Sequence, residues 1–228
     1  MLDVHGHRGA RAVLPENTLA GFEYAISVGA DYIEMDVAVT RDDVLVLSHD
    51  PVLRSGEVIR ELTREELRRA VPSVPELDEI LSLRSIGFNI EMKSYPEHPE
   101  FTPPPERCAA MLVETIRRHR VEARAIVESF DHRVLLSVRK IAPQLRLAAL
   151  IEEGDPDFVS TARASQAEMI APEFHMVTPS NVAAAHAAGI EVVTWTVNTA
   201  AGWKRMADAG VDAIITDDPA ALIAWLRG

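Results

Sequence analysis

The sequence predicts a (β/α)8 TIM barrel with a short insertion after the second strand. Short runs rich in β-branched and apolar residues alternate with segments of helical periodicity along the chain. Eight such strands are counted once one hairpin strand is left out, and polar residues suited to catalysis follow several strand ends. A doubly wound open sheet has the same alternation. However, no G-x-G-x-x-G follows the first strand, and the carboxylate positions need an enclosed centre.

The composition is that of a globular protein with one core. The chain has 228 residues, of which 47% are hydrophobic, so we expect a single domain over residues 1–228. A formal net charge of −12 gives no general attraction to nucleic acid or to an anionic membrane. The one cysteine, Cys108, excludes an intrachain disulfide and a cysteine-based metal cluster, and we expect it to be a core thiol.

The start of the chain and its apolar runs predict where the protein is found. No apolar run approaches the ~18 residues that span a bilayer, and the chain starts without a basic, apolar leader. We therefore expect a cytoplasmic protein without stable membrane insertion, unless a signal peptide has been removed. The oligomeric state is not indicated.

The first βα unit places a histidine and an arginine at a strand end. Residues 2–7 have the pattern of a strand that ends at His7 and Arg8, and glycines on both sides let the backbone turn sharply close to a ligand. A helical pattern follows, with Asn17 or Thr18 as its N-cap.

The second strand, residues 32–37, carries Glu34 and Asp36. Side chains two positions apart on a strand share a face, so both carboxylates point the same way. Two carboxylates on one face repel each other and are costly to bury, which implies a cation between them. Hard oxygen donors favour Mg²⁺ or Ca²⁺. For this stretch alone, the alternative is an edge strand with a wet face.

A hairpin returns from the second strand, because the connection to residues 44–50 is too short for a parallel crossover. Centring the turn between residues 41 and 42 places Asp36 roughly opposite Leu47. By the same geometry, His49 returns to the level of the two carboxylates.

Residues 51–75 form the predicted short insertion, with one small helix that begins at Thr63 and has Glu66 in capping-box spacing. After it the pattern is regular. The remaining strands are predicted over residues 88–93, 125–129, 145–151, 168–171, 191–197 and 212–216. The helices between them include residues 131–141 and 200–209.

In a barrel of parallel strands, catalytic groups gather where the strands end. The strand-end residues whose side chains are suited to catalysis or binding are His7 and Arg8, Glu34 and Asp36 with His49, Glu91 and Lys93, Ser129, Glu152 or Glu153, Trp195, and Thr216 with Asp217. Three carboxylates, a lysine and two histidines at one rim are hard to explain as core packing. Glu34, Asp36 and Glu91 are therefore candidate ligands of a divalent cation.

The two histidines suit acid–base catalysis near such an ion. His7 and His49 would take a proton from the attacking oxygen and give one to the leaving oxygen. Arg8 and Lys93 would help to neutralise a phosphoryl transition state. Each residue also has a structural interpretation when taken singly. For example, Lys93 can serve as the counter-ion of Glu91.

Seven ordered blocks resemble the signature of glycerophosphodiester phosphodiesterases. They are residues 7–9 (HRG), 15–18 (PENT), 33–37 (IEMDV), 48–50 (SHD), 91–93 (EMK), 195–198 (WTVN) and 210–217 (GVDAIITD). One such block is weak evidence, but seven in order are specific and extend over essentially the whole chain.

The resemblance implies a TIM barrel that uses Mg²⁺ or Ca²⁺ to hydrolyse glycerophosphodiesters to glycerol 3-phosphate and an alcohol. By position it implies His7 and His49 as acid and base, Glu34, Asp36 and Glu91 as metal ligands, Arg8 and Lys93 as phosphate contacts, Trp195 on the glycerol or head-group side, and Asn17 in positioning the loop or substrate. The insertion is short for the family, which implies an open mouth able to admit bulky groups. The expected partner is a small-molecule glycerophosphodiester, not nucleic acid.

Two other functions stay open. The first is a related phospholipase D-like or cyclising phosphodiesterase that acts on lysophospholipids. The second is a non-catalytic module that binds glycerol phosphate. The sequence does not indicate the head-group preference, the identity of the ion, or which histidine is the acid.

Overall fold

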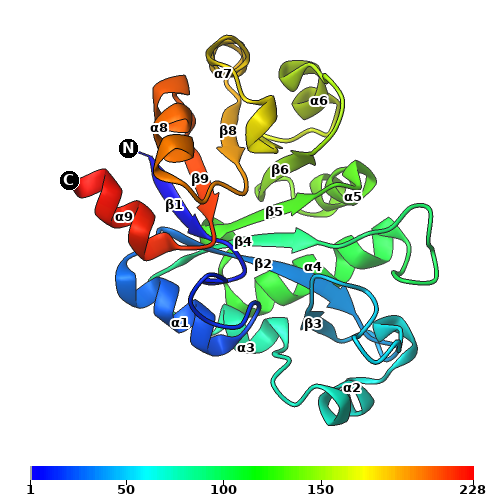
Figure 1. Ribbon diagram of the computed structural model, residues 1–228. Helices are drawn as coiled ribbons and strands as arrows, with labels where there is room; N and C mark the ends of the chain where they lie inside the picture. The colour runs from blue at the N-terminus through cyan, green and yellow to red at the C-terminus, as the bar shows by residue number, and fades with distance from the viewer. Residues whose placement is uncertain (1) are drawn as a thin grey trace.

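The computed structural model describes residues 2–228, and within them eight parallel strands form a closed barrel surrounded by helices (Figure 1). The barrel closes because β1 (Asp3–Gly6) pairs with both β9 (Ala213–Thr216) and β2 (Tyr32–Val39). From β9 the order continues through β8 (Glu191–Thr194), β7 (Met169–Pro172), β6 (Arg146–Ile151), β5 (Ala125–Ser129) and β4 (Gly87–Met92) to β2. The predicted TIM barrel is confirmed.

The helices lie outside the strands (Figure 1). They are α1 (Leu19–Val28), α2 (Arg64–Ala70), α3 (Leu77–Leu81), α4 (Pro105–His119), α5 (His132–Ile141), α6 (Phe158–Ala164), α7 (Pro179–Ala187), α8 (Ala200–Ala209) and α9 (Pro219–Arg227). Short 3₁₀ turns are η1 (Ile59–Glu61), η2 (Glu122–Arg124) and η3 (Phe174–Met176). None of the helices in residues 2–228 combines the length and apolarity needed to cross a membrane.

Local signals in the sequence set several helix ends. The Thr18 side chain accepts a hydrogen bond from the Gly21 amide at the start of α1, so Thr18 is the N-cap. Thr63 and Glu66 form the predicted capping box of α2. The predicted strand over residues 125–129 coincides with β5, and the helix over residues 200–209 coincides with α8.

The strand predicted over residues 191–197 ends earlier, at Thr194. Beyond that residue the chain leaves the regular ladder. The Trp195 amide instead bonds to the Pro172 carbonyl, and Trp195 forms only an isolated bridge with Glu173. Trp195 therefore lies just after the strand, at the mouth of the barrel.

The returning strand β3 (Leu45–Leu47) pairs antiparallel with β2, as predicted, but in a different register. Val37 lies opposite Leu47, so the register that put Asp36 opposite Leu47 is wrong by one residue. The main consequence survives, because His49 lines the same cavity as Glu34.

The hairpin loop explains this difference in register. The Thr40 amide donates to the Val44 carbonyl at 3.0 Å, which leaves three residues, 41–43, in the loop instead of two. Asp43 has a φ of 60°, in the left-handed region. A three-residue loop that ends in a left-handed residue is a common hairpin connection, and it centres the turn on Asp42.

The two faces of the barrel strands differ in character. Side chains such as Ile33, Met35 and Val37 on β2 pack outward in the main core. Burial raises the pKa of the Cys108 thiol in that core to about 12, as expected for an inert core cysteine. Inside the barrel, β5 to β9 contribute a second, apolar cluster of Ile126, Ala148, Leu150, Met169, Ala171, Val193, Ala213 and Ile215.

Candidate active site

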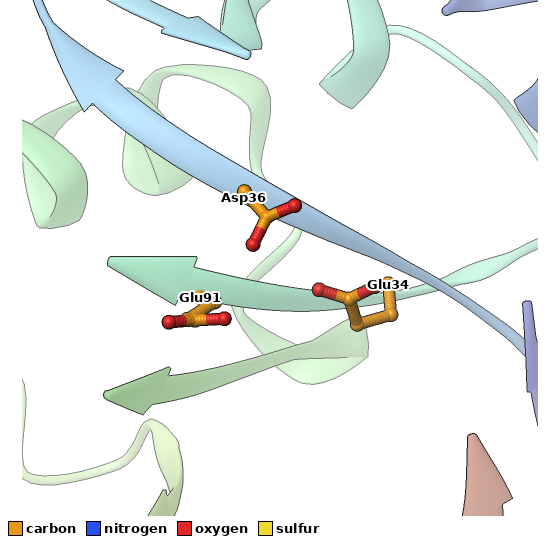
Figure 2. Close-up of side chains that lie close together, drawn as sticks. All are labelled: Glu34, Asp36 and Glu91. Carbon is orange, nitrogen blue, oxygen red and sulfur yellow. The ribbon is translucent and has the colours of Figure 1, made fainter. Parts of the chain in front are cut away.

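Three carboxylates from two adjacent strands meet inside the barrel mouth. Strands β2 and β4 pair in parallel with Asp36 opposite Glu91, and Glu34 is two residues before Asp36 on the same face. One oxygen from each of the three lies within 4.8 Å of the others. Figure 2 shows the three side chains pointing toward one another from the two strands. All three are buried, and such a set of hard oxygen donors fits a divalent cation.

The pKa values of Glu34 and Glu91 indicate an excess of buried negative charge, which a bound cation would offset. Burial, followed by the charge of Asp36, raises the pKa of Glu34 well above its usual value. Burial likewise raises the pKa of Glu91 to about 7, although Lys93 opposes the shift. Burial acts on Asp36 in the same direction, but nearby cations outweigh it and lower its pKa to about 2.

Arg8 and Lys93 supply the nearby positive charge. Arg8 Nε lies 3.0 Å from Asp36 Oδ2, and the Arg8 backbone amide donates to Glu34 Oε2 at 2.7 Å. Lys93 Nζ lies 2.9 Å from Glu91 Oε1 and 3.5 Å from Asp36 Oδ1. Both cations line the cavity, so they are placed to meet an anionic ligand there.

The turn after β1 requires its glycine. Arg8 and Gly9 both have positive φ, of 49° and 91°. A Cβ on Gly9 would lie 2.7 Å from the backbone of Gly21, so a side chain there would clash as well as strain the chain. This turn brings the Arg8 amide against Glu34.

Each candidate histidine has one ring nitrogen against a carboxylate. His7 Nδ1 lies 2.5 Å from Asp217 Oδ1, and its Nε2 lies 4.0 Å from Glu34. His49 Nδ1 lies 2.7 Å from Asp50 Oδ1. Burial, reinforced by the charge of Lys93, lowers the pKa of His49.

Both imidazoles line one cavity of about 540 Å³, together with the carboxylates Glu34 and Glu91. The sequence named Asp217 as a strand-end residue without a role. The structure makes it the partner of His7.

One wall of the cavity is apolar. Phe130, Leu150, Trp195 and Ile215 line it. The Trp195 indole Nε1 donates to the Ala171 carbonyl at 2.8 Å, and its ring packs edge-on against Phe130 with centroids 5.6 Å apart. Trp195 is therefore held in a defined orientation at the site.

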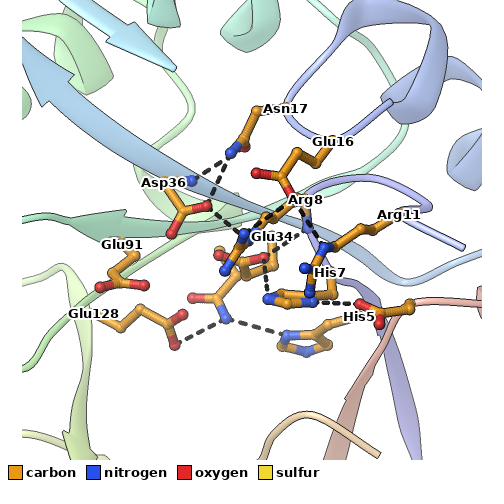
Figure 3. A network of polar contacts seen from close by, with 12 residues as sticks. His5, His7, Arg8, Arg11, Glu16, Asn17, Glu34, Asp36, Glu91 and Glu128 are labelled. Carbon is orange, nitrogen blue, oxygen red and sulfur yellow. Dashed lines mark hydrogen bonds and ion pairs between the residues drawn. The ribbon is translucent and has the colours of Figure 1, made fainter. Parts of the chain in front are cut away.

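Asn17 reaches the site indirectly. Its Nδ2 donates to Asp36 Oδ2 at 2.8 Å, and its Oδ1 accepts from the Asp36 amide at 3.3 Å (Figure 3). It lines a neighbouring cavity of about 470 Å³, which shares His49 with the first. Through these two hydrogen bonds, Asn17 fixes the position of the Asp36 side chain.

Sequence reasoning missed one carboxyl in the cavity. Glu128 on β5 lies opposite Glu91 in register, lines the cavity and is 2% exposed. Burial, reinforced by the charge of Glu91, raises its pKa to about 8. A signal was available: Glu128 shares the inward face of β5 with Ile126, on a strand adjacent to that of Glu91. For residues 125–129 the sequence pointed only to Ser129 as a site residue. In the structure the Ser129 hydroxyl donates to the Met92 carbonyl.

Residues 7–221 match the family model described as the glycerophosphoryl diester phosphodiesterase family. The chain belongs to this family. The resemblance seen in the seven sequence blocks is thus confirmed, and the chain is a glycerophosphodiester phosphodiesterase, a phosphoric diester hydrolase.

Curated relatives of the family align over nearly full length. The glycerophosphodiester phosphodiesterase of Caldanaerobacter subterraneus subsp. tengcongensis is 32% identical, covering 98% of this chain and 97% of its own. The enzyme of the same name from Bacillus altitudinis is also 32% identical, with 96% of each chain covered.

Solved structures of the family share the fold. The putative glycerophosphoryl diester phosphodiesterase of Silicibacter pomeroyi DSS-3 superposes with a TM-score of 0.91 at 31% identity, covering 100% of this chain and 93% of that chain. A phosphodiesterase of Oleispira antarctica, solved with the product sn-glycerol-3-phosphate, superposes with a TM-score of 0.89 over 99% of this chain and 97% of its own. At 22% identity, the latter likeness shows the fold alone.

Proposed function

We propose that this phosphodiesterase hydrolyses glycerophosphodiesters to glycerol 3-phosphate and an alcohol by a metal-dependent reaction in which His7 and His49 act as acid and base. One observation carries the proposal. Three carboxylate oxygens lie within 4.8 Å of one another beside a cavity that both imidazoles line. A metal-binding carboxylate set and two proton carriers facing one cavity are what hydrolysis of a diester requires.

Glu34, Asp36 and Glu91 would hold Mg²⁺ or Ca²⁺, for which buried carboxylate oxygens are suitable donors. When bound, the ion supplies positive charge to the phosphoryl oxygens. The chain's own cations, Arg8 and Lys93, lie against these carboxylates and add to that positive charge.

The hydrogen bonds of the histidines suit proton transfer. In each ring Nδ1 faces a carboxylate, Asp217 for His7 and Asp50 for His49, so Nε2 is the nitrogen left to exchange a proton with the substrate. One imidazole takes a proton as the water oxygen bonds to phosphorus. The other gives a proton to the alcohol oxygen as its bond to phosphorus breaks.

The test measures release of glycerol 3-phosphate from glycerophosphoethanolamine and glycerophosphocholine. We expect EDTA to abolish turnover and added Mg²⁺ or Ca²⁺ to restore it. We expect His7→Ala and His49→Ala each to lower kcat by about 10²- to 10⁴-fold. His98→Ala, at an exposed histidine paired with Glu100, is the matched control and should keep full activity. Full turnover by metal-free protein or by either site variant would contradict the proposal.

Phosphorus NMR of the product separates the remaining alternatives. Acyclic glycerol 3-phosphate supports attack by water. A cyclic phosphate would show that a substrate hydroxyl attacks instead. Binding of glycerol 3-phosphate without turnover of any diester would indicate a non-catalytic module.

A further inference from the structure

Glu128 is a buried carboxyl in the cavity that the proposed mechanism does not use. Its side chain is 2% exposed and lies among the cavity-lining residues. It is not one of the three carboxylates that converge on the candidate ion site. Within residues 2–228 it accepts one hydrogen bond, from Asn89 Nδ2 to its Oε2 at 2.9 Å. One of its two oxygens is therefore left without a protein donor.

A row of buried polar groups holds Glu128 in place (Figure 3). The Asn89 amide that donates to Glu128 also lies 3.4 Å from His5 Nδ1, and Asn89 is completely buried. The His5 ring in turn packs on Tyr32, with ring centroids 4.5 Å apart. These contacts order the carboxyl, so its second oxygen is presented to the cavity in a defined position.

Glu128 also lies at the boundary between the two walls of the cavity. On one side, its register partner on β4 is Glu91, in the carboxylate wall. On the other side, its register partner on β6 is Ala148, followed on the same face by Leu150 of the apolar wall. The small Ala148 side chain occupies little room beside the carboxyl. A ligand here meets an apolar surface and a strong hydrogen-bond acceptor at the same time.

A glycerol group has this combination of surfaces, because its C–H groups are apolar and its hydroxyls are donors. We propose that Glu128 accepts a hydrogen bond from a free hydroxyl of the substrate's glycerol moiety and so makes the enzyme selective for glycerophosphodiesters over diesters without that hydroxyl. The inference rests on the proposed function and names a specificity-determining residue for it. An analogue without the hydroxyl leaves the buried Glu128 oxygen unpaired, and an unpaired buried polar group is costly.

The test compares two substrates in which only this group differs. They are glycerophosphoethanolamine and an analogue with propyl in place of glycerol. We expect the unaltered enzyme to favour the glycerol substrate in kcat/KM by about 10- to 100-fold. In Glu128→Leu, which keeps a side chain of similar size, we expect that preference to fall to within about threefold of unity, mainly through slower reaction of the glycerol substrate. Any effect on metal affinity acts on both substrates and cancels in the ratio.

An equal loss on both substrates in Glu128→Leu, with the preference retained, would overturn the inference and show a structural role. Glu152→Gln is the matched control, because it removes an exposed carboxylate from the same cavity, and it should keep the preference. If circular dichroism shows that Glu128→Leu does not fold, Glu128→Gln decides. We expect it to lower the preference at least about threefold, and an unchanged preference would overturn the inference.

The two proposals fail in different ways. If the unaltered, metal-loaded enzyme releases no glycerol 3-phosphate, both proposals fall. If it turns over the glycerol substrate with no preference over the propyl analogue, only the role of Glu128 falls.

Discussion

At the scale of single residues, the site is organised by an imbalance of buried charge. Glu34, Asp36 and Glu91 carry one more charge than Arg8 and Lys93 neutralise when all are ionised. Burial raises the pKa of Glu91 to about 7 and that of Glu34 well above its usual value, which expresses the cost of this excess. A divalent cation would offset it, so the same residues that disfavour their own ionisation favour an ion.

Asp217 is the residue whose removal should separate positioning from catalysis. It lies 2.5 Å from His7 Nδ1 and holds the imidazole orientation. We expect Asp217→Asn to lower kcat by about 10- to 100-fold with little change in KM, because the ring is less well held. Steady-state kinetics check this. Asp208→Asn, at an exposed ion pair with Lys204 on α8, is the control, and a kcat equal in both variants would exclude the role.

His5 should contribute to the pH dependence of stability. Burial lowers its pKa to about 3 in the folded protein, whereas the unfolded value is about 6.5. The folded state therefore binds fewer protons, so the contribution of His5 is fully present above about pH 6.5 and is lost as the pH falls toward 3.

We expect His5→Asn to lose less unfolding free energy between pH 7 and pH 5 than the unaltered protein, by up to about 2 kcal/mol. Urea denaturation at the two pH values measures it. His98→Asn, at an exposed histidine, should show the unaltered pH dependence. Identical slopes for His5→Asn and the unaltered protein would mean that His5 is not held neutral.

At the scale of elements, the β2–β3 hairpin brings His49 to a site that β1, β2 and β4 otherwise build. Its loop depends on Asp43, which has a φ of 60° and forms ion pairs with Arg60 and Arg107. The left-handed conformation determines the number of loop residues, and the loop length determines the register of β3. The position of His49 is therefore a consequence of turn geometry.

Replacing Asp43 tests this dependence. Asp43→Gly and Asp43→Val both remove the two ion pairs, but only valine is strained at this φ. We expect Asp43→Val to be less stable than Asp43→Gly by about 1–3 kcal/mol and to lose more activity, because the hairpin that carries His49 is disturbed. Thermal unfolding and kcat of the two variants measure this. Equal stability would show that the left-handed residue does not constrain the hairpin.

At the scale of the whole molecule, the barrel interior is divided into two halves. Strands β2, β4 and β5 contribute the carboxylates, whereas β5 to β9 contribute the apolar cluster that continues to Trp195. The polar half binds charge and the apolar half excludes water, so a substrate with an anionic and an apolar part can contact both. Because the buried carboxylates lie in the polar half, the electrostatic cost of folding without a bound cation arises in that half.

Metal binding should therefore stabilise the entire fold. A ligand at about 100 times its Kd adds about 2.7 kcal/mol, which for a chain of this size corresponds to a Tm increase of roughly 5–10 °C. We expect Mg²⁺ or Ca²⁺ to produce this increase in a thermal melt, and EDTA to reverse it. Glu91→Gln, which removes one candidate ligand, should show a smaller increase. The same Tm with and without divalent ions would argue against the site.

We further propose that residues 51–75 belong to the same domain as the barrel. Ile59 and Leu67 of this segment are buried in one apolar cluster with Ala38 of β2 and Val46 of β3. The insertion thus shares its core with the hairpin that positions His49.

The sequence by itself determined the features that repeat at short range. Alternation two residues apart placed Glu34 with Asp36 and Glu91 with Lys93. Asn17 and Thr18 marked the start of α1, and the structure shows that Thr18 is the cap. Strand alternation and helix capping depend on the local geometry of the chain, so they can be deduced from neighbouring residues. The eight strands and their order of appearance followed in the same way.

Only the tertiary structure decided the contacts between distant segments. Asp217 meets His7 across 210 positions of sequence, and Glu128 depends on Asn89 from another strand. The hairpin register depended on the conformation of a single residue, Asp43. Barrel closure and loop conformation bring these groups together, and neither leaves a periodic signal in the sequence, because each is set by packing among residues far apart along the chain.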